Sequence, residues 1–326
     1  MNTPDDSNLK LTDTALLTYP HLAQRHQQLE DGQQQVSQQL VKLAVEAAIA
    51  IVINDIHYAV LMASPYQLDY LAMGFLFSEG LISQSSDLLD WDILSLSSRP
   101  VGHTSATNID DRAIHLDNRT NQTNVNGEEQ LDWSKALANQ LADYDVYVIH
   151  LVVSQRCHQR ILAQRRQLAG RTGCGMCGIT GLSQALPDLT AYQRPFMPAP
   201  NLDSLLALKD YMDTQQQAHL LTGAVHAAAT FYDGDYQLFE DVGRHNALDK
   251  LIGWQLRHQA SLDYVVMTSR LSIELVQKSI RARLPWLIGM SAPTSTATRV
   301  AQRYGLGLAG FLRDNRVTYY APQKDK

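Results

Sequence analysis

The segment Leu262-Asp263-Tyr264-Val265-Val266-Met267-Thr268-Ser269-Arg270 begins the region whose order decides the fold. Its run from Leu262 to Met267 is apolar and predicts a buried strand. The pattern that follows predicts a helix over Ser272 to Arg283 and a strand over Trp286 to Met290. Ser291 to Ser295 then leads into a second helix that ends near Gly305, and a third strand covers Leu306 to Phe311. Strands that alternate with helices predict a parallel sheet with right-handed crossovers.

Polar segments follow each of these strands, and in parallel sheets ligands bind at the carboxyl ends of strands. The candidate binding residues are Ser269, Arg270, Ser291, Thr294, Arg313, Asp314, Asn315 and Arg316. Hydroxyls at helix N-termini suit phosphate, arginines suit pyrophosphate, and Asp314 or Asn315 suits a base edge. The chain lacks the P-loop pattern, and neither of its Gly-x-Gly-x-x-Gly matches, Gly173 to Gly178 and Gly305 to Gly310, joins a predicted strand to a following helix, so a standard ATPase or NAD enzyme is not expected. A nucleotide-like anion fits these residues.

The composition describes a mildly acidic protein with a sizeable core. The chain has 326 residues, 45% of them hydrophobic, and a formal charge of −6. This length accommodates two domains, and the negative charge argues against general DNA or RNA binding. Three cysteines do not make a disulfide scaffold. Since the N-terminus is polar and no apolar run approaches a membrane span, we expect a cytoplasmic protein with reduced thiols.

The N-terminal half predicts a smaller α+β domain over residues 41–170, preceded by a disordered or loosely helical glutamine-rich tail over residues 1–40. Two apolar runs around Asn54-Asp55 predict a β-hairpin. A helix is expected from Ser64-Pro65 to Glu79-Gly80. Residues 83–134 are polar and predict a weakly structured insertion or edge hairpin. The last predicted elements are a strand over Asp145 to Val153 and a basic helix over Ser154 to Gly170.

The segment Arg171-Thr172-Gly173-Cys174-Gly175-Met176-Cys177-Gly178 predicts a mobile loop, over residues 171–182, that carries two thiols. A Cys-x-x-Cys pair can form a redox disulfide, bind one side of a metal ion, or carry sulfur as a persulfide. Nearby arginines favour the thiolate that each of these reactions needs. A structural zinc site needs four ligands. The chain has no second Cys-x-x-Cys pair, although Cys157 and His158 could join Cys174 and Cys177 in a four-ligand site.

Two further segments concentrate chemistry-bearing residues. Small residues surround His226, which fits either a packed core histidine or close approach of a ligand. Arg244 and His245 follow Glu240 and Asp241 just before a short helix. Arg244 could bind phosphate in a bidentate fork, and His245 could move protons near neutral pH. An internal salt-bridge cluster with the two acids is the alternative.

Taken together, these segments resemble the FdhD family, whose members are sulfur carriers required for formate dehydrogenase. The resemblance rests on the Cys-x-x-Cys loop and five other segments, which are Phe75 to Ile82, Thr222 to Ala229, Glu240 to Gly253, Ser269 to Lys278, and Ser291 to Ser295. It implies a C-terminal domain, over residues 183–326, that is similar to the three-layer fold of cytidine deaminases. The overall class is therefore α/β, or α+β when both domains are counted. Deaminase chemistry itself is not expected, because the chain lacks His-x-Glu and no proline precedes Cys174.

The resemblance also implies a mechanism. A cysteine desulfurase passes sulfur to the loop as a persulfide, with Cys174 as the carrier and Cys177 as its helper. The sulfur then moves to the molybdenum cofactor, a bis-molybdopterin guanine dinucleotide, before that cofactor enters formate dehydrogenase. Leu312-Arg313-Asp314-Asn315-Arg316-Val317 matches the family's cofactor-binding segment. The cofactor is bound only transiently, no resident metal is expected, and family members form homodimers.

Sulfur transfer is therefore the leading interpretation of the sequence. A non-catalytic chaperone for the molybdenum cofactor is the alternative, and a zinc-stabilised interaction protein is a third. A dithiol oxidoreductase is less favoured, because the regular sheet lies C-terminal to the cysteine pair, unlike in thioredoxins.

Overall fold

The computed structural model describes residues 16–30, 32–96, 144–165 and 186–321. These residues form a mixed α/β structure with three sheets, of six, four and two strands, which confirms the predicted fold class. Within these ranges, no helix combines the length and the apolar character needed to cross a bilayer.

The largest sheet contains the region that the sequence predicted best. Its order is β12-β11-β10-β9-β7-β8. The central strands β9 (Val265–Met267), β10 (Trp286–Gly289) and β11 (Gly307–Arg313) are parallel, as predicted. Antiparallel strands extend both sides, with β12 (Arg316–Tyr319) beside β11, and β7 (His226–Tyr232) followed by β8 (Asp235–Asp241) beside β9.

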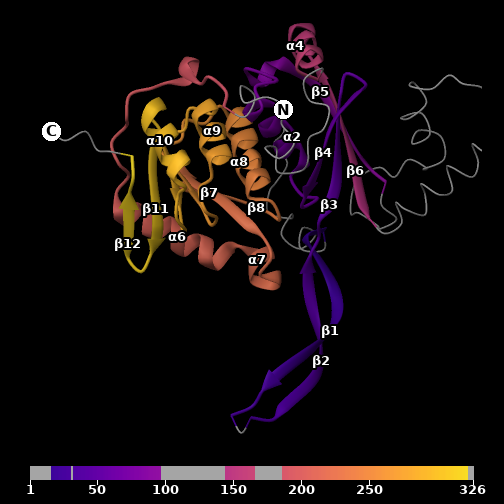
Figure 1. Ribbon diagram of the computed structural model, residues 1–326. Coiled ribbons are helices and arrows are strands. Elements are labelled where there is room, and N and C mark those ends of the chain that lie inside the picture. Colours follow the sequence, from indigo (N-terminus) through magenta and orange to yellow (C-terminus); the bar gives the residue numbers. More distant parts are fainter. Residues whose placement is uncertain (1–15, 31, 97–143, 166–185, 322–326) are drawn as a thin grey trace, which may run out of the picture.

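Helices cover both faces of this sheet (Figure 1). One face carries α8 (Arg244–His258), α9 (Ile273–Arg281) and α10 (Ser295–Tyr304), and the other carries α6 (Leu202–Gln215). Successive strand residues point to opposite faces, so Val265 and Met267 join the core under α8 to α10, whereas Tyr264 and Val266 join the core under α6. The short helix α7 (Gln217–Thr222) and the turn η4 (Thr190–Tyr192) complete this part.

The second sheet has the order β4-β3-β6-β5 and includes the predicted hairpin and strand. Strands β3 (Ala47–Ile53) and β4 (Ile56–Ala63) meet at Asn54 and Asp55, whose φ angles are 46° and 64°. Such positive φ values are those of the tight turns that asparagine and aspartate tolerate. β6 (Asp145–Val153) pairs parallel to β3, and α4 (Gln155–Arg165) follows it.

Two predictions for this region need correction. Helix α2 (Leu68–Ser78) begins three residues after the predicted Pro65, because the Ser64 amide donates to Asp241 and the Ser64 hydroxyl accepts from the Val242 amide. Part of the predicted polar insertion is ordered as the turn η2 (Ser85–Asp87) and the strand β5 (Leu88–Ser95), because β5 pairs antiparallel with β6. The rest of that insertion, from residue 97 on, lies outside the described residues.

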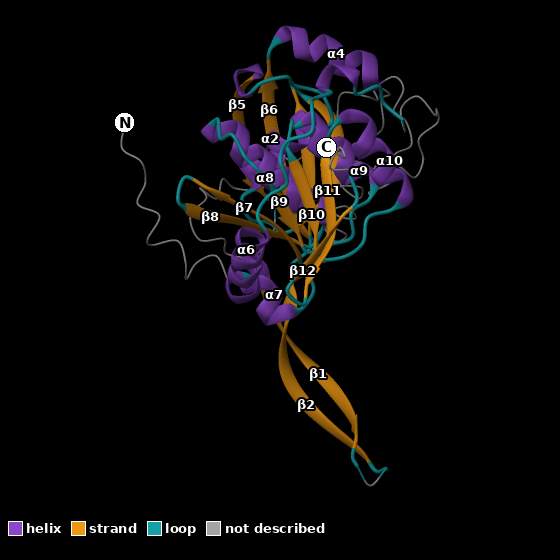
Figure 2. Ribbon diagram, turned by 90° about the vertical axis from the view of Figure 1, so that its left-hand side faces the viewer, coloured by secondary structure: helices purple, strands orange, loops and turns teal. Residues whose placement is uncertain are grey.

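The predicted tail over residues 1–40 was wrong where the structure describes it. Strands β1 (Thr18–Gln28) and β2 (Gln34–Ala44) form a two-stranded antiparallel hairpin that projects from the body (Figures 1 and 2). Gly32, with φ of 82°, permits the turn. The Asp31-Gly32 pair is a hairpin signal that the glutamine-rich composition obscured. At its base, Leu17 packs against Ala218 and Val225.

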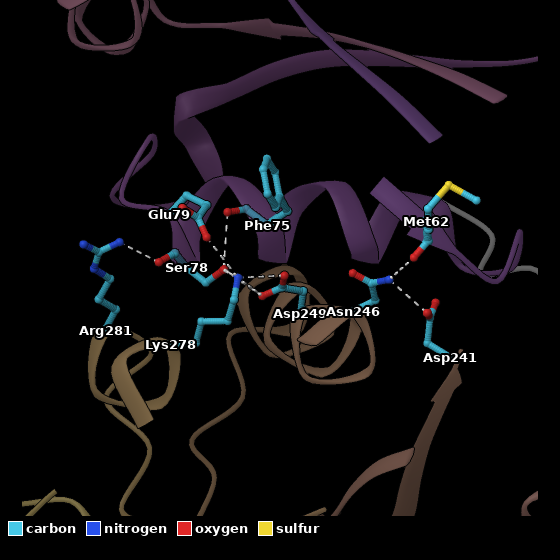
Figure 3. Close-up of polar contacts among 9 residues, drawn as sticks. All are labelled: Met62, Phe75, Ser78, Glu79, Asp241, Asn246, Asp249, Lys278 and Arg281. Carbon is cyan, nitrogen blue, oxygen red and sulfur yellow. Dashed lines mark hydrogen bonds and ion pairs between the residues drawn. The ribbon is translucent and has the colours of Figure 1, made fainter. Parts of the chain in front are cut away.

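Helix α2 joins the two larger sheets. It belongs to the core of the four-stranded sheet and lies across α8, which Figure 3 shows nearly end-on. Glycines permit this close crossing: a Cβ atom on Gly74 would lie 1.7 Å from the Asp249 carbonyl oxygen, and one on Gly253 would lie 2.0 Å from the Tyr70 carbonyl oxygen. The backbones therefore touch at the crossing, which fixes how the two sheets are oriented.

Candidate functional site

The predicted binding segments meet at the carboxyl edge of the six-stranded sheet. The Leu271 amide donates to the Ala292 carbonyl at 3.2 Å, and the Thr294 amide donates back to the Leu271 carbonyl at 3.0 Å. The Phe311 amide, on β11, donates to the Ser291 carbonyl at 3.3 Å. The structure therefore brings the segments that follow β9 and β10 together, as the sequence predicted.

The four candidate residues of these two segments differ in what they offer a ligand. Ser269 is buried, and its hydroxyl donates to the Arg270 carbonyl. Thr294 is the N-cap of α10, where its hydroxyl accepts from the Ala297 amide. The Arg270 side chain is exposed, and Ser291 is half-buried. Arg270 is therefore the solvent-exposed charge of these two segments, whereas Ser269 and Thr294 hydrogen-bond to the local backbone.

His226 lies at the same edge, because β7 is antiparallel to β9 and begins where β9 ends. The Thr268 amide donates to the Ala227 carbonyl at 3.1 Å, and the Thr268 hydroxyl accepts from the Ala227 amide at 2.9 Å. Thr268 belongs to the strand-end segment identified in the sequence but was not among the candidate binding residues. Burial and the positive charge of Arg244 lower the pKa of His226, so its imidazole is neutral near pH 7.

Arg244 and His245 form the first turn of α8, which starts at this edge because β8 runs parallel to β9. Burial, followed by the charges of Lys278 and Arg244, lowers the pKa of His245 to about 4, and Glu274 and Glu79 oppose this shift. His245 is therefore neutral at pH 7. Its Nε2 atom is buried and has no hydrogen-bond partner among the described residues.

Glu240 and Asp241 do not form the salt-bridge cluster with Arg244 and His245 that was the alternative. Asp241 pairs with Lys250 at 2.7 Å, and both side chains are fully buried. Glu240 accepts from the amides of Ala218 and His219, at the N-terminus of α7. The acids are engaged in holding β8, α7 and α8 together, so they do not neutralise Arg244.

A second buried ion pair was missed at the sequence level. Lys278 on α9 contacts Asp249 on α8 at 2.9 Å, and its ammonium also donates to Ser78 and Glu79 at the end of α2 (Figure 3). Arg281 adds a hydrogen bond to the Ser78 carbonyl. The signal was two adjacent charged residues, Asp249 and Lys250, inside an otherwise apolar stretch of a helix. Both are buried because α8 is covered by the sheet on one side and α2 on the other.

The predicted cofactor segment is the tip of the β11–β12 hairpin. Asp314 and Asn315 form the turn with φ of 52° and 55°. The side chains of Arg313 and Arg316 are exposed and lie 3.8 and 3.7 Å from the Asp314 carboxylate. The remaining two members differ, since Leu312 is fully buried in the core under α6 and Val317 is half-buried against it. Leu312 therefore holds the hairpin in place, and only the polar members face solvent.

The two cysteines of the loop, Cys174 and Cys177, lie outside the described residues. The preceding helix α4 is tied to the four-stranded sheet, since Arg156 pairs with Asp87 at 3.0 Å and Cys157 is fully buried in the apolar core. Cys157 is therefore a member of the apolar core.

The described edge suits an anionic ligand. The N-termini of α8, α9 and α10 follow strands β8, β9 and β10, which are parallel to one another, and so open toward the same edge. Helix N-termini present free amides and a partial positive charge. Arg244 and Arg270 add full charges, and the histidines there are neutral. This arrangement favours phosphate groups over cations.

Comparisons with known proteins point to one family. The FdhD/NarQ family model matches residues 44–325. A protein of Variovorax paradoxus named sulfur carrier protein FdhD is 35% identical over 288 residues, covering 86% of this chain and 85% of that protein. A protein of the same name from Shewanella oneidensis is 32% identical over 296 residues, covering 90% and 88%.

A solved structure shows the same fold. It belongs to a candidate formate dehydrogenase accessory protein of Desulfotalea psychrophila, with a TM-score of 0.60, 18% identity, and coverage of 94% of this chain and 98% of that chain. The family match spans most of the chain, and the relatives exceed 30% identity over most of both lengths. The chain therefore belongs to the FdhD/NarQ family.

Proposed function

We propose that this chain is a sulfurtransferase that carries sulfur, as a persulfide on Cys174, to the molybdenum cofactor of a formate dehydrogenase. Its relatives named sulfur carrier protein FdhD support the carrier role. The Cys-x-x-Cys spacing and the arginine that precedes it support a reactive thiolate at Cys174.

The first transfer is a thiol–persulfide exchange. The Cys174 thiolate attacks the terminal sulfur of a persulfide on the cysteine desulfurase; a new S–S bond forms on Cys174, and the desulfurase thiolate leaves. Oxidation states are conserved overall, so no further oxidant is needed. In the second transfer the S–S bond of the Cys174 persulfide breaks and Cys174 leaves as a thiolate; the acceptor cofactor supplies the two electrons that reduce the transferred sulfur to sulfide. Cys177 is the helper thiol of this cycle.

The observation that carries the acceptor side of the proposal is the carboxyl edge of the six-stranded sheet. The acceptor is a bis-molybdopterin guanine dinucleotide, whose pyrophosphate and guanine groups need amides, cations and polar side chains. Arg244 and Arg270 stand at helix N-termini there, and their charges are not neutralised by Glu240 or Asp241. The exposed Arg313 and Arg316 are the further cofactor-binding candidates.

The carrier role is tested by intact-protein mass spectrometry after incubation with a cysteine desulfurase and cysteine, without reductant. Wild type is expected to gain one reducible sulfur atom, and Cys174→Ala to gain none. Cys157→Ala is the control, because its thiol is fully buried and the gain should persist. Persistent sulfur on Cys174→Ala, or no gain on wild type with active desulfurase, would refute the carrier role. A cofactor-binding chaperone would then be the better description.

The binding edge is tested separately, with guanosine diphosphate as the probe. Arg244→Ala and Arg270→Ala should each weaken binding by about tenfold or more, because a hydrogen bond to a charged group contributes about 1.5–3 kcal/mol. Arg303→Ala is the control, since Arg303 is in the last turn of α10, away from the N-terminal end. Equal affinities in all four proteins would place the nucleotide elsewhere.

A further inference from the structure

Three buried polar atoms near the N-termini of α8 and α9 have no hydrogen-bond partner among the described residues. They are Nε2 of His245, Oγ of Ser272 and Oε2 of Glu274. Ser272 is the N-cap of α9, a position where a serine hydroxyl usually accepts from a backbone amide, and here it does not. Buried polar groups in native proteins are nearly always hydrogen-bonded. Unpaired atoms from two helices therefore indicate that a further molecule completes the bonding at this place.

The ion pair one turn away shows that His245 and Glu274 are neighbours. Asp249 on α8 contacts Lys278 on α9 at 2.9 Å (Figure 3). His245 lies four residues before Asp249 on α8, and residues four apart share one face of a helix. Glu274 lies four residues before Lys278 on α9. Because the two helices follow parallel strands, β8 and β9, both steps lead toward the carboxyl edge, where the charge of Glu274 acts on His245.

The Glu274 carboxylate is left free by its nearest cation on the same helix. A glutamate and a lysine four residues apart on a helix can form an ion pair. The Lys278 ammonium donates instead to Asp249 and to the end of α2 (Figure 3). Within the described residues, Glu274 forms no ion pair and no hydrogen bond through Oε2. Its carboxylate is therefore available to a ligand.

The charges along this edge separate two kinds of ligand group. Arg244, Arg270 and the helix N-termini suit phosphate. The Glu274 carboxylate accepts hydrogen bonds and would repel phosphate. A ligand group beside it must therefore donate hydrogen bonds without being anionic. The neutral ring of His245 can donate from Nε2 to a carbonyl oxygen of the same group.

We propose that Glu274 recognises an amino-keto ring edge of the ligand, accepting from a ring N–H and the exocyclic amino group, while the His245 Nε2–H donates to the ring oxygen. Guanine and pterin share this edge, and the cofactor named under the proposed function contains both rings. Adenine differs, because it presents an acceptor where this edge presents the ring N–H. The inference rests on the proposed function and adds Glu274, which was not among the candidate binding residues.

The guanine arm of the test measures the binding of guanosine diphosphate and adenosine diphosphate to the full chain by calorimetry. Wild type should prefer guanosine diphosphate. Glu274→Gln should lower the affinity for guanosine diphosphate about tenfold or more and spare adenosine diphosphate, because only guanine loses hydrogen bonds to a charged group. Arg244→Ala should weaken both nucleotides alike, since both carry the phosphates. A residue that only held the fold would also change both affinities alike.

The pterin arm uses pterin and lumazine, its analogue with a 2-oxo group in place of the amino group, and follows their fluorescence. Wild type should prefer pterin, and Glu274→Gln should lose that preference. Loss of preference in one arm alone identifies the ring that occupies the edge. Loss in both arms shows that the edge accepts either ring.

Two matched variants complete the test. Asp203→Asn changes another first-turn acid, on α6 at the opposite face of the sheet. Asp314→Asn changes the other candidate for reading a base, at the exposed tip of the β11–β12 hairpin. Both variants should keep the preferences of wild type.

Unchanged preferences in Glu274→Gln would overturn the inference and leave water as the partner of the buried atoms. Loss of preference in Asp314→Asn alone, or a wild type without preference in either arm, would overturn it too. A wild type that binds neither ring would overturn it together with the acceptor side of the proposed function. The sulfur gain on Cys174 tests the carrier role separately.

Discussion

The ion pair of Asp249 and Lys278 gives the sharpest prediction about stability. The Lys278 ammonium lies 3.0 and 2.9 Å from the two Asp249 carboxylate oxygens, 2.7 Å from the Ser78 hydroxyl oxygen and 3.3 Å from the nearest Glu79 oxygen. The side chain of Asp249 is 2% exposed and that of Lys278 10%. We consider Asp249→Asn, Lys278→Met and the double variant.

The contacts predict that the two single variants differ. Removing one partner of a buried pair costs about 3–5 kcal/mol, because the other charge stays buried. After Asp249→Asn, Lys278 keeps the Glu79 carboxylate, so the cost should fall near 3 kcal/mol. After Lys278→Met, the Asp249 carboxylate keeps only the Ser78 hydroxyl as a side-chain partner among the described residues, so the cost should approach 5 kcal/mol. The double variant leaves neither charge there and should cost less than the two single costs added together.

Burial lowers the pKa of Lys278, but the charges of Asp249 and Glu79 outweigh burial and raise the pKa above that of a free lysine. A raised lysine pKa stabilises the fold at all pH values below the unfolded pKa, and this stability is lost only in alkaline solution. Burial raises the pKa of Asp249, against the charge of Lys278. Without that charge the lone carboxyl takes up a proton more readily as the pH falls, so Lys278→Met should cost less at pH 6 than at pH 8.

The assay is urea unfolding followed by far-UV circular dichroism and tryptophan fluorescence. Lys209→Met is the control, since Lys209 pairs at 2.6 Å with an exposed residue, Asp213, four positions along α6. Exposed pairs of this kind contribute about 0.3–0.5 kcal/mol. Costs below 1 kcal/mol for both single variants, or costs that simply add in the double variant, would refute the assignment of a coupled buried pair.

Three further predictions follow from single residues. As the pH falls from 6.5 to 4, wild type should lose about 3 kcal/mol of unfolding free energy through His245, because this histidine protonates in the unfolded chain before it does in the folded one, where its pKa is about 4. His245→Gln should not show this part of the loss. Unfolding at pH 7.5 and pH 4.5 measures the difference, and an equal pH dependence in both proteins would contradict the prediction. Gly253→Ala should lower the free energy of unfolding by at least about 3 kcal/mol or prevent folding, because the added Cβ atom would lie 2.0 Å from the Tyr70 carbonyl oxygen. A folded variant with an unchanged urea midpoint would contradict the close crossing of α2 and α8. Cys157 should react with a maleimide only in urea, because its side chain is fully buried. Peptide mass mapping compares the labelling of Cys157 in native and in unfolded protein, and equal labelling rates would contradict this burial.

The sequence was most informative where local signals agree with the fold. The apolar run before Thr268 and the cap residue Thr294 set the positions of β9 and α10 with little help from distant residues. The edge that carries Ser269 to Arg270 and Ser291 to Thr294 could be predicted, because parallel strands end on the same side.

Other features depend on contacts between residues far apart in the chain. Ser64 is held by Asp241, which delays the start of α2, and Lys278 is held by Asp249 and Ser78 from two other helices. Local propensity contains no information about such partners. The β1–β2 hairpin was mispredicted for a different reason: the glutamine-rich composition suggested disorder, although Asp31-Gly32 in the sequence is a turn signal between the two strands that pair.

The close crossing of α2 and α8 has a consequence for the segment that contains both cysteines. The described residues that flank residues 166–185 belong to different hydrophobic cores. On one side Ile161 of α4 packs in the core of the four-stranded sheet, and on the other Leu189 packs in the core under α8 to α10. The separation of these two anchor points is therefore set by the glycine-mediated crossing. A substitution at Gly74 or Gly253 that shifted one sheet against the other would change the span that the thiol-bearing segment has to bridge, although neither glycine lies near a cysteine in the sequence.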